Sequence, residues 1–478
     1  MLPQVHFKTS KRKTVRRLAI FGATGDVTAR MLFPALANLA ELSRLPRSLS
    51  VLAVGRREWT TRQFRRHLRN QLKNHSINLQ AETYDRILSD VRYRRVQDLG
   101  DQVQVEKALG SSASPTICYL ALPPSTFPTI LETFNHLELH PESQVVFEKP
   151  FGEDLRSCKE LNQMVHKSFP EPQVYRIDHF LGKQTVRNIL DLRFANRFFE
   201  PIWNNHHIER VEITWDETLA LEGRASYYDS AGALRDMIQN HLLQLLCLIS
   251  MEPPITFSER DFRDRKVEVL RAVRRLSAEE VKRHSVRARY DSGQINGRKI
   301  PAYVQEKGVN SDRNTETFAR VTFWIDNWRW SGVPFTLRTG KALAPDKQEI
   351  AIYFRPVSHL AFNDGKRLCP NIVRFQMNPD TIAMSVNLGG LGDSFQSDSQ
   401  ELAAELTNQT LPPYGHLLLD VLNRDTTMFI RSDEAEELWK IVEPVMESWK
   451  GGDVPLGRYP AGSEGPQKFS PTDPDGLG

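Results

Sequence analysis

The sequence predicts an α/β domain followed by an α+β domain, and three patterns carry this prediction. Residues 15–21 form an apolar strand that ends in Gly22-Ala-Thr-Gly25-Asp26, and an amphipathic helix follows. Further short apolar strands are expected at 49–54, 117–122, 144–147 and 174–177. Beyond residue 183, expected strands such as 208–215 alternate apolar and polar residues, which is typical of antiparallel sheets. We therefore predict a Rossmann-like domain, then a large, mostly antiparallel sheet flanked by helices.

The composition is that of a soluble globular protein. The 478 residues are 40% hydrophobic and 26% charged, which is enough chain for two or three domains. No apolar run approaches the roughly 18 residues of a membrane span, and residues 1–17 lack the apolar core of a secretory signal. The cysteines at 118, 158, 247 and 369 have no metal-ligand spacing, so we expect reduced thiols, no metal site and a cytoplasmic protein.

Basic residues are unevenly distributed, although the formal net charge is only +4. One run lies between Lys8 and Arg17, and we interpret it as a solvated tail. A second run contains Arg56, Arg57, Arg62, Arg65, Arg66 and Arg69. Nucleic-acid binding requires a recognised module or interleaved aromatic residues. The sequence shows neither, so we expect no nucleic-acid partner, and we expect no membrane partner.

The glycine turn predicts a dinucleotide site. Glycine lets the backbone approach a pyrophosphate closely, and the following helix supplies amide donors and a favourable dipole. Gly22, Thr24, Gly25 and Asp26 are therefore candidate cofactor-binding residues. The third glycine of the usual fingerprint is absent, so the spacing alone is a weak signal.

The second expected strand ends at Arg56 and Arg57, where this kind of fold reads the adenosine ribose. An acidic residue there would accept from a 2′-hydroxyl and repel a 2′-phosphate, whereas arginine binds the phosphate through bidentate charge-assisted bonds. The two arginines therefore predict NADP in preference to NAD. Glu58 follows directly and leaves use of NAD open.

Two clusters of ionisable residues lie in apolar surroundings. Residues 174–183 begin with a buried strand, which leads directly into Asp178, His179 and Lys183. This pattern is typical of the end of a strand that carries catalytic residues. Residues 234–243 carry Asp236 and His241 in a core-like helix. A buried histidine beside a carboxylate is suited to general-base catalysis. In the competing interpretation, Asp178 and His179 pair with each other or cap a helix near residue 182.

Lys149 follows the strand at 144–147, in the segment Glu148-Lys149-Pro150. One interpretation is an ordinary surface lysine. At the carboxyl end of a strand in this fold, however, a lysine faces the cofactor crevice. Lys149 is therefore a candidate cofactor-binding residue.

The chain resembles a known family. Residues 176–183, RIDHFLGK, closely resemble the active-site signature of glucose-6-phosphate dehydrogenases, which is usually RIDHYLGKE. Further collinear matches cover most of the chain: Gly22 to Asp26, Glu148 to Gly152, Leu192 to Asn196, Arg235 to Leu243, Met251 to Pro254, Asp326 to Trp330, Gly332 to Phe335 and Arg338 to Lys341. The sequence is therefore identified as a divergent member of this family.

The resemblance implies an NADP-dependent oxidation of C1 of glucose 6-phosphate to 6-phosphogluconolactone, the entry step of the oxidative pentose phosphate pathway. It implies that His241 is the base, that Asp178 is its partner, and that Lys149 lies where nicotinamide and substrate meet, beside a cis or hinge Pro150. The large sheet is expected to form the interface of a homodimer or homotetramer. The implied sugar-phosphate contacts are His179, Lys183, Glu217, Asp236 and Lys341.

Some positions depart from the family pattern. Phe180 replaces a tyrosine that donates to the phosphate, and losing such a bond costs roughly 1.5–3 kcal/mol. Asp346 stands where many members carry a cation, so it would repel a phosphate unless Lys347 takes over. Met31 and Gln184 replace a common lysine and glutamate. Two alternatives therefore stay open: a dehydrogenase of a different hexose derivative, and a non-catalytic regulatory paralogue.

The expected elements and the resemblance together divide the chain into four segments. Residues 1–14 are a basic tail, 15–176 the NADP-binding Rossmann-like domain, 177–450 the substrate-binding and dimerisation α+β domain, and 451–478 an extended tail. Within them, helix is expected across 81–110, from 183 to about 199, and across 411–449. Later strands are expected at 318–325, 349–354, 371–376 and 381–386.

Overall fold

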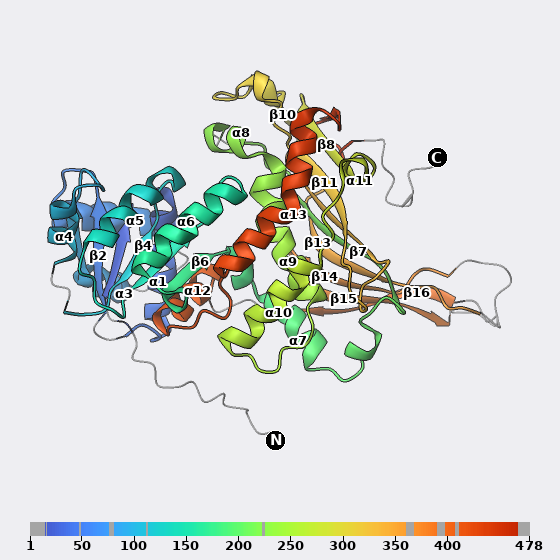
Figure 1. Cartoon of the computed structure of the whole chain (residues 1–478), viewed down its shortest axis with the longest axis horizontal. Helices are drawn as coiled ribbons and strands as arrows, with labels where there is room; N and C mark the ends of the chain where they lie inside the picture. Colours follow the sequence, from blue (N-terminus) through green and yellow to red (C-terminus); the bar gives the residue numbers. More distant parts are fainter. Residues whose placement is uncertain are drawn as a thin grey trace. The chain divides into compact units, whose positions relative to one another are not determined.

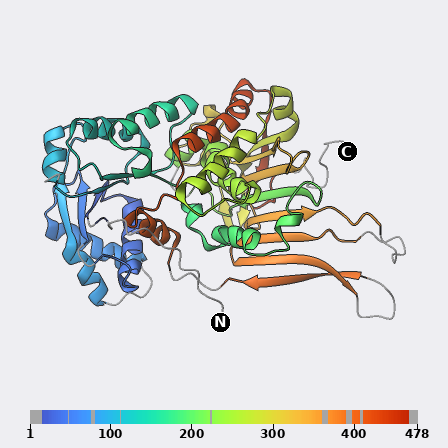
Figure 2. The same cartoon turned by 60° about the horizontal axis from the view of Figure 1, so that its bottom comes forward.

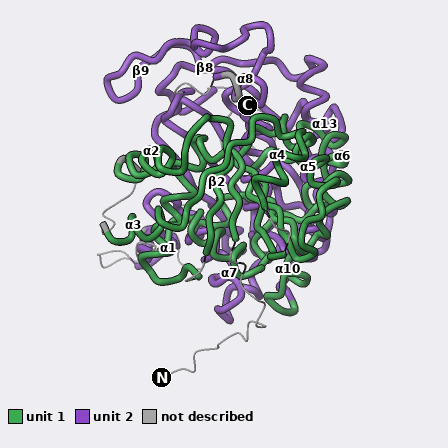
Figure 3. Tube along the Cα trace, turned by 90° about the vertical axis from the view of Figure 1, so that its left-hand side faces the viewer, with its two compact units in different colours: residues 1–183, 255–263, 409–435 green, residues 184–254, 264–408, 436–478 purple. Residues whose placement is uncertain are grey.

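The computed structural model describes residues 15, 17–46, 49–75, 81–110, 113–221, 225–359, 368–389, 397–406 and 411–466. The chain forms two compact units, which Figure 3 shows in different colours. Unit 1 comprises Met1–Lys183, Ile255–Arg263 and Gln409–Ala435. Unit 2 comprises Gln184–Pro254, Asp264–Asn408 and Glu436–Gly478. The basic tail predicted at 1–14 lies outside the described residues.

The units are not the contiguous segments 15–176 and 177–450 that the sequence suggests, because 255–263 and 409–435 return to unit 1. Helix α12 (Pro413–Leu422) packs against α1 (Phe33–Glu41) and contributes buried leucines to the core of unit 1. The Thr426 hydroxyl donates to Glu259 at 2.8 Å and joins the two returning segments. Such packing involves residues that are distant in sequence, so local pattern does not reveal it.

Unit 1 is built around a six-stranded sheet in which every neighbouring pair is parallel (Figure 1). The order is β3-β2-β1-β4-β5-β6, so it reverses between β1 and β4. Ligands bind at such a reversal, outside the carboxyl ends of the strands. The predicted Rossmann-like fold is confirmed. The strands are β1 (Arg17–Phe21), β2 (Ser50–Gly55), β3 (Val91–Arg95), β4 (Ile117–Leu120), β5 (Gln144–Glu148) and β6 (Val174–Ile177).

Helices cover both faces of this sheet. On one face, α1, α2 (Thr61–His75), α3 (Ala81–Asp90) and α12 share a core with alternate strand residues such as Ile20. On the other face, Phe21 meets Phe134 of α5 (Phe127–His136) with ring centroids 5.6 Å apart. Helices α4 (Gln102–Leu109) and α6 (Leu155–Ser168) flank α5. Strands buried on both sides explain the continuous apolar runs of the sequence.

The prediction of helix across 81–110 is wrong for its middle part. Residues 91–95 form β3, which pairs with β2 at the edge of the sheet. Only Val91 and Tyr93 of this strand are buried, and its three arginines are exposed. An edge strand with so few apolar residues gives little hydrophobic signal, and this explains the error.

A buried charge cluster ties β6 to a returning segment of unit 1. Arg176 is 2% exposed, pairs with Glu171 at 2.9 Å and donates to the Asn162 side chain at 2.9 Å. Arg263, from segment 255–263, lies 4.0 Å from the same glutamate. Burial alone would raise the pKa of Glu171, but Arg176, His166 and Arg263 outweigh burial and hold this pKa at about 2. Glu171 is therefore ionised at neutral pH and lies near two arginines, Arg176 and Arg263.

Unit 2 contains a nine-stranded sheet, ordered β16-β15-β14-β13-β7-β12-β11-β8-β17, which Figure 2 shows from a second side. The sheet is mostly antiparallel, as predicted, but the pairs β7–β12 and β8–β17 are parallel. The expectation of a purely antiparallel strand at 208–215 is thus corrected, since local sequence does not report a strand's neighbours. The strands are β7 (Ile208–Asp216), β8 (Ser285–Asp291), β11 (Phe318–Trp324), β12 (Pro334–Gly340), β13 (Lys347–Phe354), β14 (Ile372–Met377), β15 (Asp380–Gly389), β16 (Ser397–Glu405) and β17 (Leu456–Pro460).

Strand β17 corrects the extended tail predicted at 451–478. It pairs in parallel with β8, and the Tyr459 hydroxyl donates to the Lys341 carbonyl oxygen at 2.7 Å. The strand is too short for a periodic signal, and glycine and proline dominate its surroundings. Residues 467–478 lie outside the described residues.

Helices cover one face of the nine-stranded sheet. Helix α7 (Gln184–Phe194) packs on β14 and β15, whereas η6 (Leu234–Leu242) packs on β11 and β12. Every residue of α9 (Leu243–Ser250) is buried. The helix predicted at 411–449 is two helices, α12 and α13 (Ser432–Gly451). The others are α8 (Ala225–Ala233), α10 (Glu259–Ala272) and α11 (Ala278–His284), and a small hairpin joins β9 (Gly293–Ile295) to β10 (Arg298–Ile300).

Two composition-based expectations can be compared with the fold. Among the described residues, no helix combines the length and apolarity that crossing a bilayer requires. Cys118, Cys158 and Cys247 are buried and Cys369 is exposed, and no disulfide joins any of the four. The expectation of reduced thiols stays a prediction.

Candidate active site

The glycine turn lies at the reversal in strand order. Gly22 has φ +84°, and a Cβ there would lie 2.0 Å from the Ala121 carbonyl oxygen after β4, so only glycine fits. The Gly25 N–H donates to the Gly22 carbonyl at 2.9 Å and closes the turn around Thr24. The helical turn η1 (Thr28–Leu32) then leads into α1. A close backbone approach combined with a helix N-terminus fits the pyrophosphate of a dinucleotide.

Three further predicted cofactor residues, Asp26, Arg56 and Arg57, lie in the loops that follow β1 and β2. Asp26 is exposed and pairs with Arg30 at 2.8 Å. Arg56 and Arg57 follow β2 in an exposed turn, and the Arg57 guanidinium lies 4.7 Å from the ring centroid of Trp59. Unit 1 therefore presents cations at the strand end where dinucleotide-binding folds in general read the adenosine ribose.

Lys149 follows β5 directly, and the peptide bond between it and Pro150 is cis, as expected. The preceding Glu148 accepts hydrogen bonds from the Tyr119 hydroxyl and, at 3.3 Å, from the Tyr414 hydroxyl. Desolvation raises the pKa of Glu148 to about 7, against the opposing effects of these two donors and of Lys149. The end of β5 thus presents a lysine beside a carboxyl group that titrates near neutral pH.

Asp178 lies at the end of β6 and is 1% exposed. Its Oδ1 atom accepts from the Phe180 N–H at 2.9 Å and caps the short turn η4 (His179–Gly182). Asp178 therefore does act as a cap through one carboxylate oxygen, but it caps the turn 179–182 and not a helix that begins near Gly182. Capping also fixes the orientation of the carboxylate, which a catalytic role needs.

The turn η4 arranges the remaining predicted residues of unit 1. The His179 ring stacks on Tyr414, with centroids 6.2 Å apart and planes 15° apart. Phe180 is 2% exposed, and the Lys183 ammonium lies 5.7 Å from its ring centroid. The phenylalanine that replaces the family's tyrosine thus keeps an aromatic face beside the lysine, a cation–π arrangement.

His241 lies in unit 2 on η6, a π-helical segment, and is 1% exposed. π-helical turns occur frequently at functional sites. Glu316 fixes the start of this segment by accepting from the Leu234 N–H at 3.0 Å. Gly232, with φ +73°, has no room for a Cβ, which would lie 2.4 Å from the same glutamate oxygen. The N-terminal end of η6, the segment that carries His241, is therefore fixed in place.

Three predicted substrate residues gather around Tyr228 in unit 2. Lys341 forms an ion pair with Glu217, and its ammonium lies 5.4 Å from the Tyr228 ring centroid. Burial raises the pKa of Tyr228, and the charges of Asp236 and Glu217 raise it further. Glu217 and Lys341 follow β7 and β12, whose parallel pairing puts their carboxyl ends at one edge. Acids, a cation and a phenol together suit the recognition of sugar hydroxyls.

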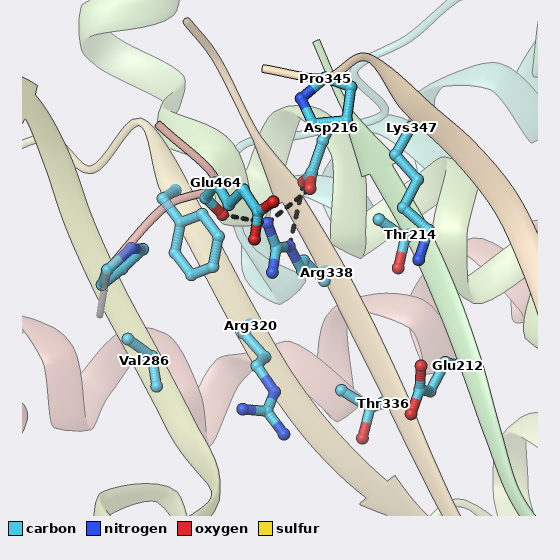
Figure 4. Close-up of a pocket in the computed structure, with 12 residues that line it drawn as sticks. Glu212, Thr214, Asp216, Val286, Arg320, Thr336, Arg338, Pro345, Lys347 and Glu464 are labelled. Atoms are coloured by element: carbon cyan, nitrogen blue, oxygen red, sulfur yellow. Dashed lines mark hydrogen bonds and ion pairs between the residues drawn. The ribbon is translucent and has the colours of Figure 1, made fainter. Parts of the chain in front are cut away.

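Asp346 and Lys347 lie beside a pocket on the polar face of the nine-stranded sheet (Figure 4). Inside the pocket, Asp216 and Arg338 pair at 2.6 Å. Burial raises the pKa of Asp216 to about 6, although Arg338 opposes the rise. Lys347 pairs with Glu349 of its own strand at 2.9 Å. The idea that Lys347 takes over a phosphate contact stays a prediction.

Tyr414, Tyr228 and Glu316 are the neighbours of candidate residues that the sequence analysis missed. Tyr414 reaches Glu148 and His179 from a returning helix more than 200 residues downstream. Isolated tyrosines and glutamates carry no local signal of such contacts. A match to a family motif would have identified these three residues, but all three lie outside the motifs that carry the resemblance.

Comparison with known proteins identifies the family to which this chain belongs. A parallel sheet with a glycine turn at its reversal is typical of a dinucleotide-binding unit. Residues 19–188 match the NAD binding domain of glucose-6-phosphate dehydrogenase, which makes the unit that of a nicotinamide-dependent oxidoreductase. Residues 190–472 match the C-terminal domain of the same family. The chain therefore belongs to the glucose-6-phosphate dehydrogenase family, as the sequence motifs predict.

Individual relatives agree with this assignment. A glucose-6-phosphate 1-dehydrogenase of Treponema pallidum (strain Nichols) is 40% identical over 474 residues, covering 94% of this chain and 92% of the relative. The crystal structure of a glucose-6-phosphate 1-dehydrogenase from Mycobacterium avium has a TM-score of 0.83 at 34% identity and covers 95% of both chains. A glucose-6-phosphate dehydrogenase in complex with glucose 6-phosphate has a TM-score of 0.86 at 31% identity, covering 96% of this chain and 97% of its own.

Proposed function

We propose that this chain oxidises C1 of glucose 6-phosphate to 6-phosphogluconolactone and transfers the hydride to NADP. The observation that carries the proposal is full-length membership of a family whose relatives are named glucose-6-phosphate 1-dehydrogenases. Retention of Asp178, His241 and Lys149 supports catalysis over a regulatory role, because a chain released from catalysis has no need of a buried histidine base. The reaction class is the entry step of oxidative pentose phosphate metabolism in the cytoplasm.

The chemistry requires removal of a proton from O1 and a hydride from C1. NADP, when bound, accepts the hydride. His241 takes the proton, and Asp178 stabilises the imidazolium that forms. The hydrogen bond that Asp178 accepts from the Phe180 N–H holds this carboxylate in one orientation. Lys149 contributes a positive charge where cofactor and substrate meet.

The sugar phosphate is held by residues from two clusters. His179 and Lys183 bind the phosphate, and Glu217, Asp236 and Lys341 bind the ring hydroxyls and hold C1 in a near-attack geometry. The ion pair between Lys341 and Glu217 supports this role because it keeps both side chains in place. Phe180 supplies no hydroxyl, so Lys183 and His179 carry the anion recognition. We also expect a homodimer or homotetramer formed through the nine-stranded sheet.

NADP is the preferred cofactor in this proposal. Arg56 and Arg57 lie in the exposed turn after β2, where a ribose 2′-phosphate is read. Glu58 in the same turn pairs with Arg95 at 3.5 Å. This pairing draws the carboxylate toward β3, which reduces its competition for the position of the 2′-phosphate and disfavours NAD.

Replacing Lys341 tests the substrate part of the proposal. Lys341→Met is expected to raise the KM for glucose 6-phosphate about tenfold or more, because a hydrogen bond to a charged group contributes roughly 1.5–3 kcal/mol. The KM for NADP should stay unchanged. Steady-state kinetics with each substrate varied in turn measures both values. Lys299→Met, at an exposed lysine of the same unit, is the matched control. An unchanged sugar-phosphate KM in Lys341→Met would remove this residue from the site.

A further inference from the structure

In the turn after β2, the guanidinium of Arg57 lies over the ring of Trp59. The guanidinium carbon lies 4.7 Å from the ring centroid of Trp59. Stacking engages the flat face of a guanidinium, whereas its N–H donors lie in the plane and point outward. A stacked arginine therefore keeps the fork that binds a phosphate bidentately. The indole restricts the motion of Arg57 without consuming its donors.

Trp59 is itself fixed by an aromatic cluster within unit 1. Its ring centroid lies 5.0 Å from that of His67, 6.3 Å from that of Tyr93 and 6.4 Å from that of Phe64. The Tyr93 hydroxyl donates to the Arg57 carbonyl oxygen at 2.8 Å, and the backbone N–H of Trp59 donates to the same oxygen at 2.9 Å. Trp59 thus contacts both the backbone and the side chain of Arg57, and residues of α2 and β3 hold Trp59 in turn.

The charges around Arg57 also leave its guanidinium available to an anion. Glu58, the one acidic residue of the turn, lies 3.5 Å from Arg95 of β3. Burial, and then the charge of Arg57, lower the pKa of His67. The His67 imidazole is therefore neutral near pH 7 and does not repel the arginine.

We propose that Trp59 is a positioning residue for the 2′-phosphate of the cofactor: by stacking on Arg57 it holds the guanidinium in phosphate-binding geometry and thereby sets the preference for NADP over NAD. The inference rests on the proposed use of NADP. NAD has no 2′-phosphate, so only NADP gains from the alignment. Trp59 acts through Arg57, and its contribution appears in cofactor selectivity rather than in kcat.

The test compares two variants at this position. Trp59→Leu, which removes the ring, is expected to lower kcat/KM for NADP about three- to fivefold and to leave kcat/KM for NAD unchanged, because an exposed cation–π contact contributes a factor of this order. Trp59→Phe, which keeps an aromatic face, is expected to restore most of the ratio. Titration with adenosine 2′,5′-bisphosphate and with adenosine 5′-monophosphate gives a readout independent of turnover. Only the bisphosphate should bind Trp59→Leu more weakly.

Each outcome decides the question. An equal loss for both cofactors, or an unchanged ratio in Trp59→Leu, would overturn the proposal, because a packing role alone affects both cofactors alike. Arg57→Ala separates this failure from failure of the proposed function. If Arg57→Ala abolishes the NADP preference and Trp59→Leu does not, NADP use stands and the role of Trp59 falls. If the unaltered chain shows no NADP preference, the cofactor proposal itself falls. Should Trp59→Leu not fold, the same titrations on Trp59→Met decide.

Discussion

Replacing His241 with asparagine is expected to lower kcat by about 10²- to 10⁴-fold, the range that a positioned general base contributes. Asparagine keeps the approximate size of the imidazole and cannot accept the O1 proton near neutral pH. The KM for NADP should change little, because the glycine turn and Arg57 belong to unit 1 whereas His241 belongs to unit 2. Steady-state kinetics near pH 8 measures both parameters.

A second histidine provides the control for this variant. His206 is exposed in the same unit, and His206→Asn should keep full activity. Thermal unfolding of both variants shows whether the buried substitution has damaged the fold. A folded His241→Asn protein with kcat within about twofold of the unaltered chain would remove His241 from the role of base.

Replacing Arg176 with methionine is expected to have the largest effect on stability. The variant leaves Glu171 without the closer of its two arginines, and removing one partner of a buried ion pair typically costs about 3–5 kcal/mol. A loss of this size lowers the unfolding midpoint of a unit of this length by at least about 6 °C. Scanning calorimetry measures the midpoint. Arg156→Met is the matched control, because Arg156 forms an exposed pair with Glu160 and should shift the midpoint little.

The same cluster predicts a dependence of stability on pH. The pKa of Glu171 is about 2 in the folded chain, below its ordinary value of 4.5. A group with a lowered folded pKa stabilises the fold above its unfolded pKa, and this contribution is lost as the pH falls toward the folded value. The unfolding midpoint should therefore fall between pH 4.5 and pH 2, and less steeply in Arg176→Met. Parallel pH profiles of the two proteins would contradict the central role of the Arg176–Glu171 pair.

The sequence was sufficient to predict most of unit 1 and the general character of unit 2. Strands buried on both faces, such as β1, β4 and β5, appear as continuous apolar runs, and the glycine turn marks the first crossover. Strands β3 and β17 escaped prediction because edge strands bury few side chains. The return of 255–263 and 409–435 to unit 1 depends on packing across long sequence separations, for which one sequence carries no signal.

The candidate residues were predictable to different degrees, for physical reasons. A histidine inside an apolar helix and an aspartate at a buried strand end stand out by chemistry alone, so the sequence predicts His241 and Asp178 without the resemblance. Glu217 and Lys341 were found only through the resemblance, because each is an ordinary charge in local sequence. The structure then shows them paired through the parallel neighbours β7 and β12. Tyr414, which joins Glu148 to His179, needed the fold itself.

The most direct test is the initial rate of cofactor reduction near pH 8, with glucose 6-phosphate varied against NADP and against NAD, and with plain glucose as the control. The proposed function predicts saturable turnover with glucose 6-phosphate, a higher kcat/KM for NADP than for NAD, and negligible turnover of glucose. Such a result would also show that Phe180 and Asp346 are compatible with phosphate recognition. Absence of turnover with glucose 6-phosphate, in a folded protein that binds NADP by titration, would contradict the proposed function.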